Sequence, residues 1–138
     1  MKKYYYFLIL FIFISCNSKT DGVKSGTFEL YKNDSLIGYV YRVGHYQIED
    51  YPENTELIAR IDHQTDSTYL LKGIEKKQDG IDSIVWLNHY KEIAQNKYKI
   101  VAIPYNSNIE YKYEGVLLKV SNEVKGEYLK RLRLLNEK

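Results

Sequence analysis

The sequence predicts an all-β fold: a small antiparallel meander of about eight strands, arranged as a barrel or a sandwich. From Gly26 onward, apolar residues recur at every second position in short segments, as in strands with one buried face. Turn residues separate these segments at short intervals. Tyrosine, which is favoured in strands, is unusually common, with 15 residues against 4 Phe and 1 Trp.

The first half of the domain alternates strand and turn signals. The polar residues 32–35 predict one turn, and a loop is expected over residues 51–54 around Pro52. Tyr39 and Tyr41 lie two positions apart, so they share one face of a strand. We expect strands here over residues 26–31, 36–43, 55–62 and 68–74.

The second half has a strong turn signal at residues 78–80 and a hairpin loop at 106–108. Residues 89–96 are ambiguous because several of them tolerate a helix. Tyr111 and Tyr113 share one face of the longest expected strand. We expect strands over residues 83–87, 98–103, 109–120 and 128–135.

The last of these segments has two interpretations. Leu129, Leu132 and Leu135 also recur at a helical spacing, so residues 128–135 fit a helix. We favour the strand, which would follow a turn over residues 122–126.

The amino-terminal segment 1–15 predicts a lipoprotein signal peptide. Two lysines precede an apolar run of 11 residues, Tyr4 to Ile14, and small Ser15 follows. A membrane-spanning helix needs about 20 apolar residues, so this run is too short to span. Phe13-Ile14-Ser15-Cys16 resembles the bacterial lipobox, with phenylalanine where leucine is usual.

The lipobox resemblance implies that Cys16 is acylated after export. Its sulfur would take a diacylglyceryl group, and the new amino terminus a further chain such as palmitate. Two or three chains give stable anchoring, since each buried methylene contributes about 0.8 kcal/mol. We therefore expect residues 16–25 to be the lipidated cysteine and a flexible tether, and residues 26–138 to be the β domain. With one cysteine in the chain, no internal disulfide can form.

The charge of the mature chain argues against nucleic acid as a partner. Removal of residues 1–15 takes away Lys2 and Lys3 and no acid, so 20 basic and 18 acidic residues become 18 and 18. The 123 residues that remain suit a single domain. Nucleic-acid-binding domains carry a concentrated basic face. Equal numbers of basic and acidic residues do not indicate such a face.

We expect no enzyme, no cofactor and no metal site. The chain has no Gly-x-Ser-x-Gly motif, no glycine-rich phosphate loop, and its lone cysteine is assigned to lipid. The histidines are far apart, and a polar turn explains Asp62 and Asp66 beside one of them. Residues 79–82 lack the further oxygen ligands of a calcium loop. The histidines are His45, His63 and His89.

Aromatic side chains are the one candidate for ligand binding. Two strand faces that carry paired tyrosines, together with a tryptophan strand, could line one groove and stack on a sugar or an apolar ligand. The alternative is that they only pack the domain or cover its outside. The candidate residues are Tyr39, Tyr41, Trp86, Tyr111 and Tyr113.

Three short segments and the lipobox together resemble small uncharacterised lipoproteins of Bacteroidota. The segments are Ser25–Leu30, Asp82–Asn88 and Ile109–Tyr113. The family usually has an acidic residue and a second cysteine after the asparagine, where this chain has His89 and Tyr90. The resemblance implies a β-rich exported domain. Some members carry a topoisomerase label, which does not transfer to a small, neutral, exported domain.

The function expected from these observations is that of a lipid-anchored envelope protein, more consistent with the outer membrane than the inner. Its first partner is membrane lipid, bound through Cys16. The preferred role is a non-catalytic accessory module that binds an envelope protein through a sheet edge or an aromatic face. The alternatives are a lipocalin-like carrier of a small apolar ligand and a surface glycan-binding protein.

Overall fold

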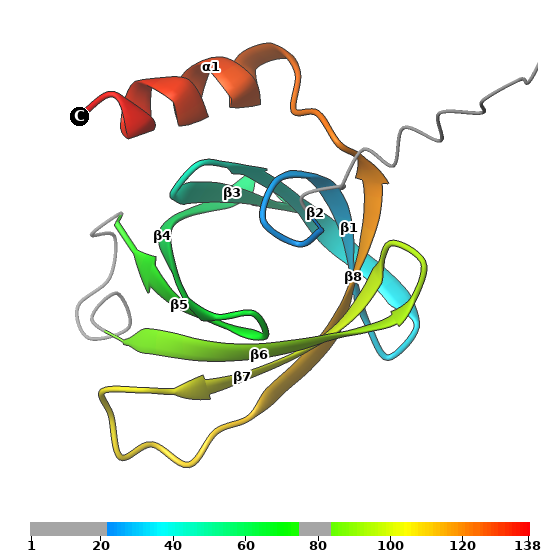
Figure 1. The fold of residues 1–138 in the computed structure, drawn as a ribbon, viewed down its shortest axis with the longest axis vertical. Helices are drawn as coiled ribbons and strands as arrows, with labels where there is room; N and C mark the ends of the chain where they lie inside the picture. The colour runs from blue at the N-terminus through cyan, green and yellow to red at the C-terminus, as the bar shows by residue number, and fades with distance from the viewer. Residues whose placement is uncertain (1–21, 75–83) are drawn as a thin grey trace, which may run out of the picture.

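The computed structural model describes residues 22–74 and 84–138. They form a closed barrel of eight antiparallel strands with one helix on its outside (Figure 1). Each strand pairs with the next along the chain, and β8 pairs with β1. The strands are β1 Gly26–Lys32, β2 Ser35–Val43, β3 Tyr46–Tyr51, β4 Thr55–Thr65, β5 Thr68–Gly73, β6 Val85–Ala94, β7 Lys97–Pro104 and β8 Tyr113–Ser121. The helix is α1 Gly126–Asn136.

The predicted all-β class is confirmed, and the barrel is the form it takes. The predicted signal peptide, Cys16, most of the tether and the turn at 78–80 lie outside the described residues. Residues 89–94, ambiguous in the sequence, continue strand β6. The strand expected over 109–120 begins only at Tyr113, so Tyr111 lies in the β7–β8 connection.

The sequence analysis did not predict strand β3, because the inward positions of this strand are polar and its buried outward position is apolar. Gln47 and Glu49 face the barrel interior, whereas Ile48 faces outward and is fully buried beneath the helix. A strand whose apolar residue points away from the barrel interior does not show the expected pattern.

The preferred strand over residues 128–135 is wrong, since this segment is helix α1. As a strand it would place Leu129, Arg131 and Arg133 on one face, and burying two arginines is costly. As a helix it gathers Leu129, Leu132 and Leu135 on one stripe that packs on Ile48. The stripe lies across the outside of β2 and β3 (Figure 1).

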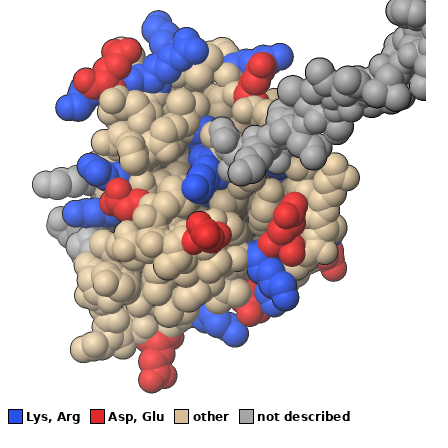
Figure 2. All heavy atoms as spheres, in the orientation of Figure 1, with Lys and Arg blue, Asp and Glu red and all other residues tan. Residues whose placement is uncertain are grey.

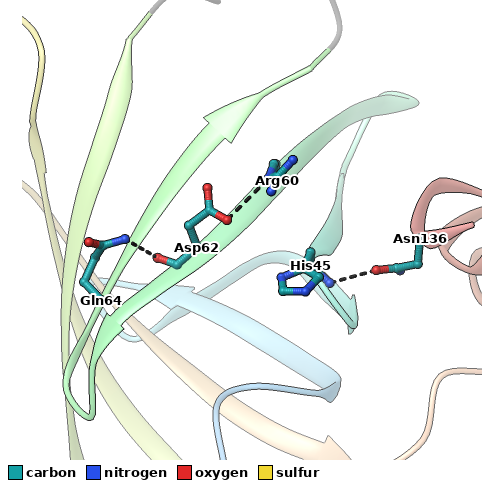
Figure 3. Close-up of polar contacts among 5 residues, drawn as sticks. All are labelled: His45, Arg60, Asp62, Gln64 and Asn136. Carbon is teal, nitrogen blue, oxygen red and sulfur yellow. Dashed lines mark hydrogen bonds and ion pairs between the residues drawn. The ribbon is translucent and has the colours of Figure 1, made fainter. Parts of the chain in front are cut away.

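An asparagine ties the end of this helix to the barrel. The Asn136 side-chain nitrogen donates to the Val43 carbonyl at 2.9 Å, and its oxygen accepts from the His45 backbone N–H at 2.9 Å (Figure 3). The carboxyl-terminal helix therefore covers the outer surface of the sheet and leaves the interior untouched.

The amino-terminal segment closes one end of the barrel. Val23 is buried in the core, and its carbonyl accepts a hydrogen bond of 2.8 Å from Arg42 Nη1. The Gly22 carbonyl accepts a hydrogen bond of 2.9 Å from Lys119 Nζ. We call this the closed end. The opposite end, which carries the β1–β2, β3–β4 and β7–β8 connections, is the mouth.

A cluster of buried apolar side chains fills much of the barrel interior. Its buried members come from β1, β2, β7 and β8 and from the plugging segment. They are Val23, Phe28, Leu30, Val40, Tyr98, Ile100 and Leu117. Tyr90 of β6 packs against this cluster, and Ala59, Ile61 and Tyr69 of β4 and β5 are buried as well.

Candidate functional site

Apolar side chains that face the interior are reached by solvent at the mouth. Leu57 shares its strand face with buried Ala59 and Ile61, yet it is 51% exposed. Leu71 and Trp86 lie directly opposite each other on β5 and β6, and both are partly exposed. We call the inner surface formed by Leu57, Ala59, Leu71, Gly73 and Trp86 the recess.

There is free space beside Gly73 in the recess. Gly73 lies opposite buried Ala59, and a Cβ atom added to it would meet no described atom within 4 Å. Two glycines of the other wall are crowded instead. A Cβ at Gly38 would lie 2.6 Å from the Asp50 carbonyl oxygen, and one at Gly115 would lie 2.9 Å from the Tyr113 ring. Of these three inward-facing glycines, only Gly73 has open space beside it.

A buried arginine organises the polar centre of the barrel. Arg42 is 2% exposed, and each guanidinium nitrogen donates one hydrogen bond of 2.8 Å. Nε donates to Gln47, Nη1 to the Val23 carbonyl and Nη2 to the Tyr69 hydroxyl. The guanidinium also lies over the Tyr69 ring, 4.8 Å from its centroid. Three acceptors, one for each guanidinium nitrogen, compensate for the burial of this charge.

Glu49 extends this network toward the mouth. One carboxylate oxygen accepts from Gln47 Nε2 and the other from the Tyr51 hydroxyl, both at 2.5 Å. Burial raises the pKa of Glu49, and the two hydrogen bonds and Arg42 offset that rise only in part. Glu49 lies directly opposite Leu57 in the β3–β4 ladder, so the carboxyl group borders the recess.

Two buried polar groups have no hydrogen-bond partner among the described residues. One is the Tyr113 hydroxyl, and the other is the His63 ring, at both nitrogens. Burial and the nearby Glu49 charge raise the pKa of Tyr113 to about 12. Burial lowers the pKa of His63. An unpaired buried hydroxyl is costly, so the one at Tyr113 marks a place where a ligand or water can bind.

The five aromatic residues singled out in the sequence separate into two groups. Tyr39 and Tyr41 lie on the outside of β2, where Tyr41 stacks on Tyr128 of the helix with ring centroids 4.0 Å apart. Tyr111 meets Trp86 edge to face at 5.8 Å, at the mouth. Tyr113 turns inward over Gly115. The two tyrosine pairs therefore lie on opposite sides of the barrel wall and do not line one groove.

Sequence reasoning missed the polar residues of the interior. Arg42, Gln47 and Glu49 carry no motif, and they stand out only as polar residues at inward positions of an alternating pattern. Recognition of β3 would have been needed to find the last two. Tyr69 and Gly73 carried no signal, because their role depends on strands paired across the barrel.

An open depression of about 470 Å³ lies on the outer surface along β1, β7 and β8. Lys97 and Lys99 border it together with Val116 and Leu118. Over the face seen in Figure 2, basic and acidic side chains are interspersed. Arg60 and Asp62 form an exposed ion pair, with Nε and Oδ1 3.3 Å apart (Figure 3).

The sequence analysis weighed three histidines and their acidic neighbours as metal ligands and predicted no site. His45 lies in the β2–β3 turn, His63 faces inward from β4, and His89 is exposed on β6. Across residues 22–74 and 84–138, no group of three or more His, Cys, Asp or Glu side chains is placed to hold a metal ion. The sequence 79–82 lies outside the described residues.

The titration of Glu49 makes a testable contribution to stability. A raised native pKa means that the unfolded chain releases this proton at lower pH than the folded protein does. The free energy of unfolding should therefore fall as the pH rises from about 4.5 through the native pKa. In Glu49→Gln this fall should disappear, as measured by urea denaturation at a series of pH values.

The control for this experiment is Glu114→Gln, a change at an exposed carboxylate that pairs with Lys112 on the surface. It should keep the pH dependence of the unaltered protein. Identical pH profiles for Glu49→Gln and the unaltered protein would contradict the assignment of a buried acid to this position.

The described part of the chain contains no helix long and apolar enough to cross a membrane. Comparison of the chain with protein-family models, with curated proteins and with solved structures finds no match in any of the three.

Proposed function

We propose that this protein is a lipid-anchored carrier that holds a small, largely apolar ligand in the barrel mouth. The observation that carries the proposal is the space at Gly73, beside apolar inward-facing side chains that solvent reaches. An eight-stranded barrel is just wide enough to be filled by side chains or to hold one small ligand. Ligand sites of this kind are concave and mostly apolar, with a few polar groups that orient the ligand.

The closed barrel favours the carrier over the accessory module expected first. Strand addition to a sheet edge requires unpaired backbone groups, whereas every strand of this barrel is paired on both sides. Binding of an envelope protein would then have to use an aromatic face. Tyr41, one candidate for such a face, is engaged with Tyr128 of the helix.

The position of the anchor agrees with this role. Gly22 lies at the closed end, six positions after Cys16, which is a reach of at most about 20 Å. An acylated Cys16 would hold the closed end near the bilayer and leave the mouth, at the opposite end, open to incoming ligand. We infer an envelope location from this anchor, as the lipobox implies.

The carrier proposal predicts the effect of filling the recess. Gly73→Leu should weaken binding of the uncharged probe N-phenyl-1-naphthylamine about tenfold or more, because the leucine occupies the ligand's space. Folding should be preserved, since Gly73 has a backbone conformation open to any residue. Probe fluorescence gives the affinity, and emission of the single tryptophan, Trp86, reports directly on the recess.

Lys72→Leu is the matched control, since it adds the same side chain one residue away, at an exposed position. It should bind the probe as the unaltered protein does. Equal affinity in Gly73→Leu and Lys72→Leu, with unchanged Trp86 emission, would overturn the carrier proposal.

The anchor has its own test. Cys16→Ser removes the thiol that takes the lipid, so the protein should lose incorporated palmitate and leave the membrane fraction or stay as an unprocessed precursor. Labelled palmitate and membrane fractionation measure both properties. A Cys16→Ser protein that still labels and sediments with membranes would contradict the anchor.

A further inference from the structure

A lysine ammonium group and an unpaired hydroxyl group lie close together at the mouth. Lys32 ends β1, and its Nζ lies 5.1 Å from the ring centroid of Tyr113, which begins the neighbouring strand β8. The Tyr113 hydroxyl is buried and has no hydrogen-bond partner among the described residues. Since the ammonium group and the hydroxyl do not bond each other, both can donate to a third group that enters the mouth.

The charge of Lys32 is directed at an aromatic ring and not at an acid. Within residues 22–74 and 84–138, no carboxylate forms an ion pair with Lys32. Glu114, the residue after Tyr113, pairs instead with Lys112 at 3.2 Å. Lys32 is exposed, so a ligand that enters from the mouth meets its positive charge.

The inner surface of β7 joins this pair of donors to the recess. Trp86 lies opposite Pro104 in the β6–β7 ladder, and Tyr113 lies opposite Ala102 in the β7–β8 ladder. Ala102 and Pro104 are two positions apart, so they share one face of the strand. Strands β6 and β8 are two strand spacings apart, roughly 10 Å. An apolar chain that lies against Trp86 can therefore extend along this wall to Tyr113.

Two donors at the end of an apolar wall call for a head group that accepts hydrogen bonds. A carboxylate offers two oxygens, one for the Tyr113 hydroxyl and one for Lys32, and it neutralises the ammonium charge. An alcohol can accept from these donors, but its uncharged hydrogen bonds are about half as strong. An ammonium head group has no acceptor, and Lys32 would repel it.

The interior acid nearest the mouth has its own partners. Glu49 lies two residues before Tyr51 on β3, and its oxygens accept from Gln47 and the Tyr51 hydroxyl. Burial raises the pKa of Glu49, which favours its neutral form, and Arg42 offsets the charge that remains. The repulsion between Glu49 and a bound anion is thereby reduced.

We propose that the recess selects amphipathic ligands with a carboxylate head group, bound by Lys32 and the Tyr113 hydroxyl, with the apolar chain against Trp86 and Leu71. This inference rests on the carrier function proposed above and names the ligand class of the same site.

The test uses three ligands that differ only at the head group. Decanoate, decan-1-ol and decylammonium compete for bound N-phenyl-1-naphthylamine at neutral pH. Decanoate should displace the probe at a concentration about tenfold lower than either of the others, because it alone can pair with Lys32.

Two substitutions of Lys32 then identify the group that binds the head group. Lys32→Met keeps an apolar side chain over Tyr113 but removes the charge, so the preference for decanoate should disappear. Lys32→Glu reverses the charge and should make decylammonium a better competitor than decanoate. Affinity for the probe itself should change little in both variants, since the probe is uncharged.

The control variant is Lys99→Met, which removes the charge of an exposed lysine on the outer face of β7. It should keep the full preference for decanoate. Circular dichroism establishes that each variant folds. A preference that survives Lys32→Met, or that is lost equally in Lys99→Met, would overturn the proposed site.

The outcomes separate the two proposals. If the probe binds and Gly73→Leu abolishes binding, but the three ligands compete equally, the carrier function stands and the carboxylate selectivity is wrong. Preference of the unaltered protein for decan-1-ol or decylammonium likewise overturns the selectivity alone. If no probe binds to the unaltered protein, the carrier function and the selectivity both fail.

Discussion

Replacement of Arg42 with methionine should lower the free energy of unfolding by about 3–5 kcal/mol, the usual cost of breaking a buried charged network. Methionine fills much of the arginine volume but donates nothing. It would leave three acceptors without their donor, at Gln47, Tyr69 and the Val23 carbonyl. Glu49 would lose the positive charge that partly offsets its burial. Urea denaturation followed by Trp86 emission measures the change.

Arg60→Met is the matched control for this substitution. Arg60 pairs with Asp62 on the outer surface, where both side chains are about half exposed (Figure 3). Exposed ion pairs contribute little, so this variant should stay within about 0.5 kcal/mol of the unaltered protein. Equal stability of Arg42→Met and Arg60→Met would show that the interior network does not hold the barrel together.

Truncation of Leu132 to alanine should cost about 2–5 kcal/mol, the range for deleting a buried leucine side chain. Leu132 is completely buried, and it packs with Ile48 and Val124 between the helix and β3. The remaining attachments of the helix include Asn136 and the bidentate pair of Arg131 with Glu56. Thermal unfolding gives the stability change, and amide exchange over β2 and β3 reports loosening of the helix.

Leu134→Ala provides the comparison on the same helix, because Leu134 is 52% exposed. Its effect should be within about 0.5 kcal/mol. If the two leucine variants are equally stable, the helix does not contribute to the core beneath it, and its packing against β3 is of no energetic consequence.

The strands that the sequence predicted are those whose inward residues are apolar. Phe28 and Leu30 alternate with polar neighbours, and this local pattern suffices to recognise β1. The same rule fails for β3, where Gln47 and Glu49 face inward and Ile48 packs under a helix from the other end of the chain. The pattern there reflects partners that are distant in sequence.

Residues 128–135 are difficult for a different reason, because their local pattern fits both a helix and a strand. Leu129, Leu132 and Leu135 fit a helix, whereas alternation with Lys130 and Arg133 also resembles a strand over part of the segment. The barrel already closes by pairing β8 with β1, so no position is left for another strand. The helix is the form in which this segment can bury its leucines on the outside.

The sequence by itself determined the all-β class and the apolar alternation of most strands, and it predicts the lipid attachment at Cys16, because all of these depend on neighbouring residues. Only the tertiary structure decided that the sheet closes, that Val23 plugs one end, and that Glu49, Gly73 and Tyr113 surround one mouth. Those residues come from β3, β5 and β8, and they meet only because strand pairing and barrel closure bring distant segments together.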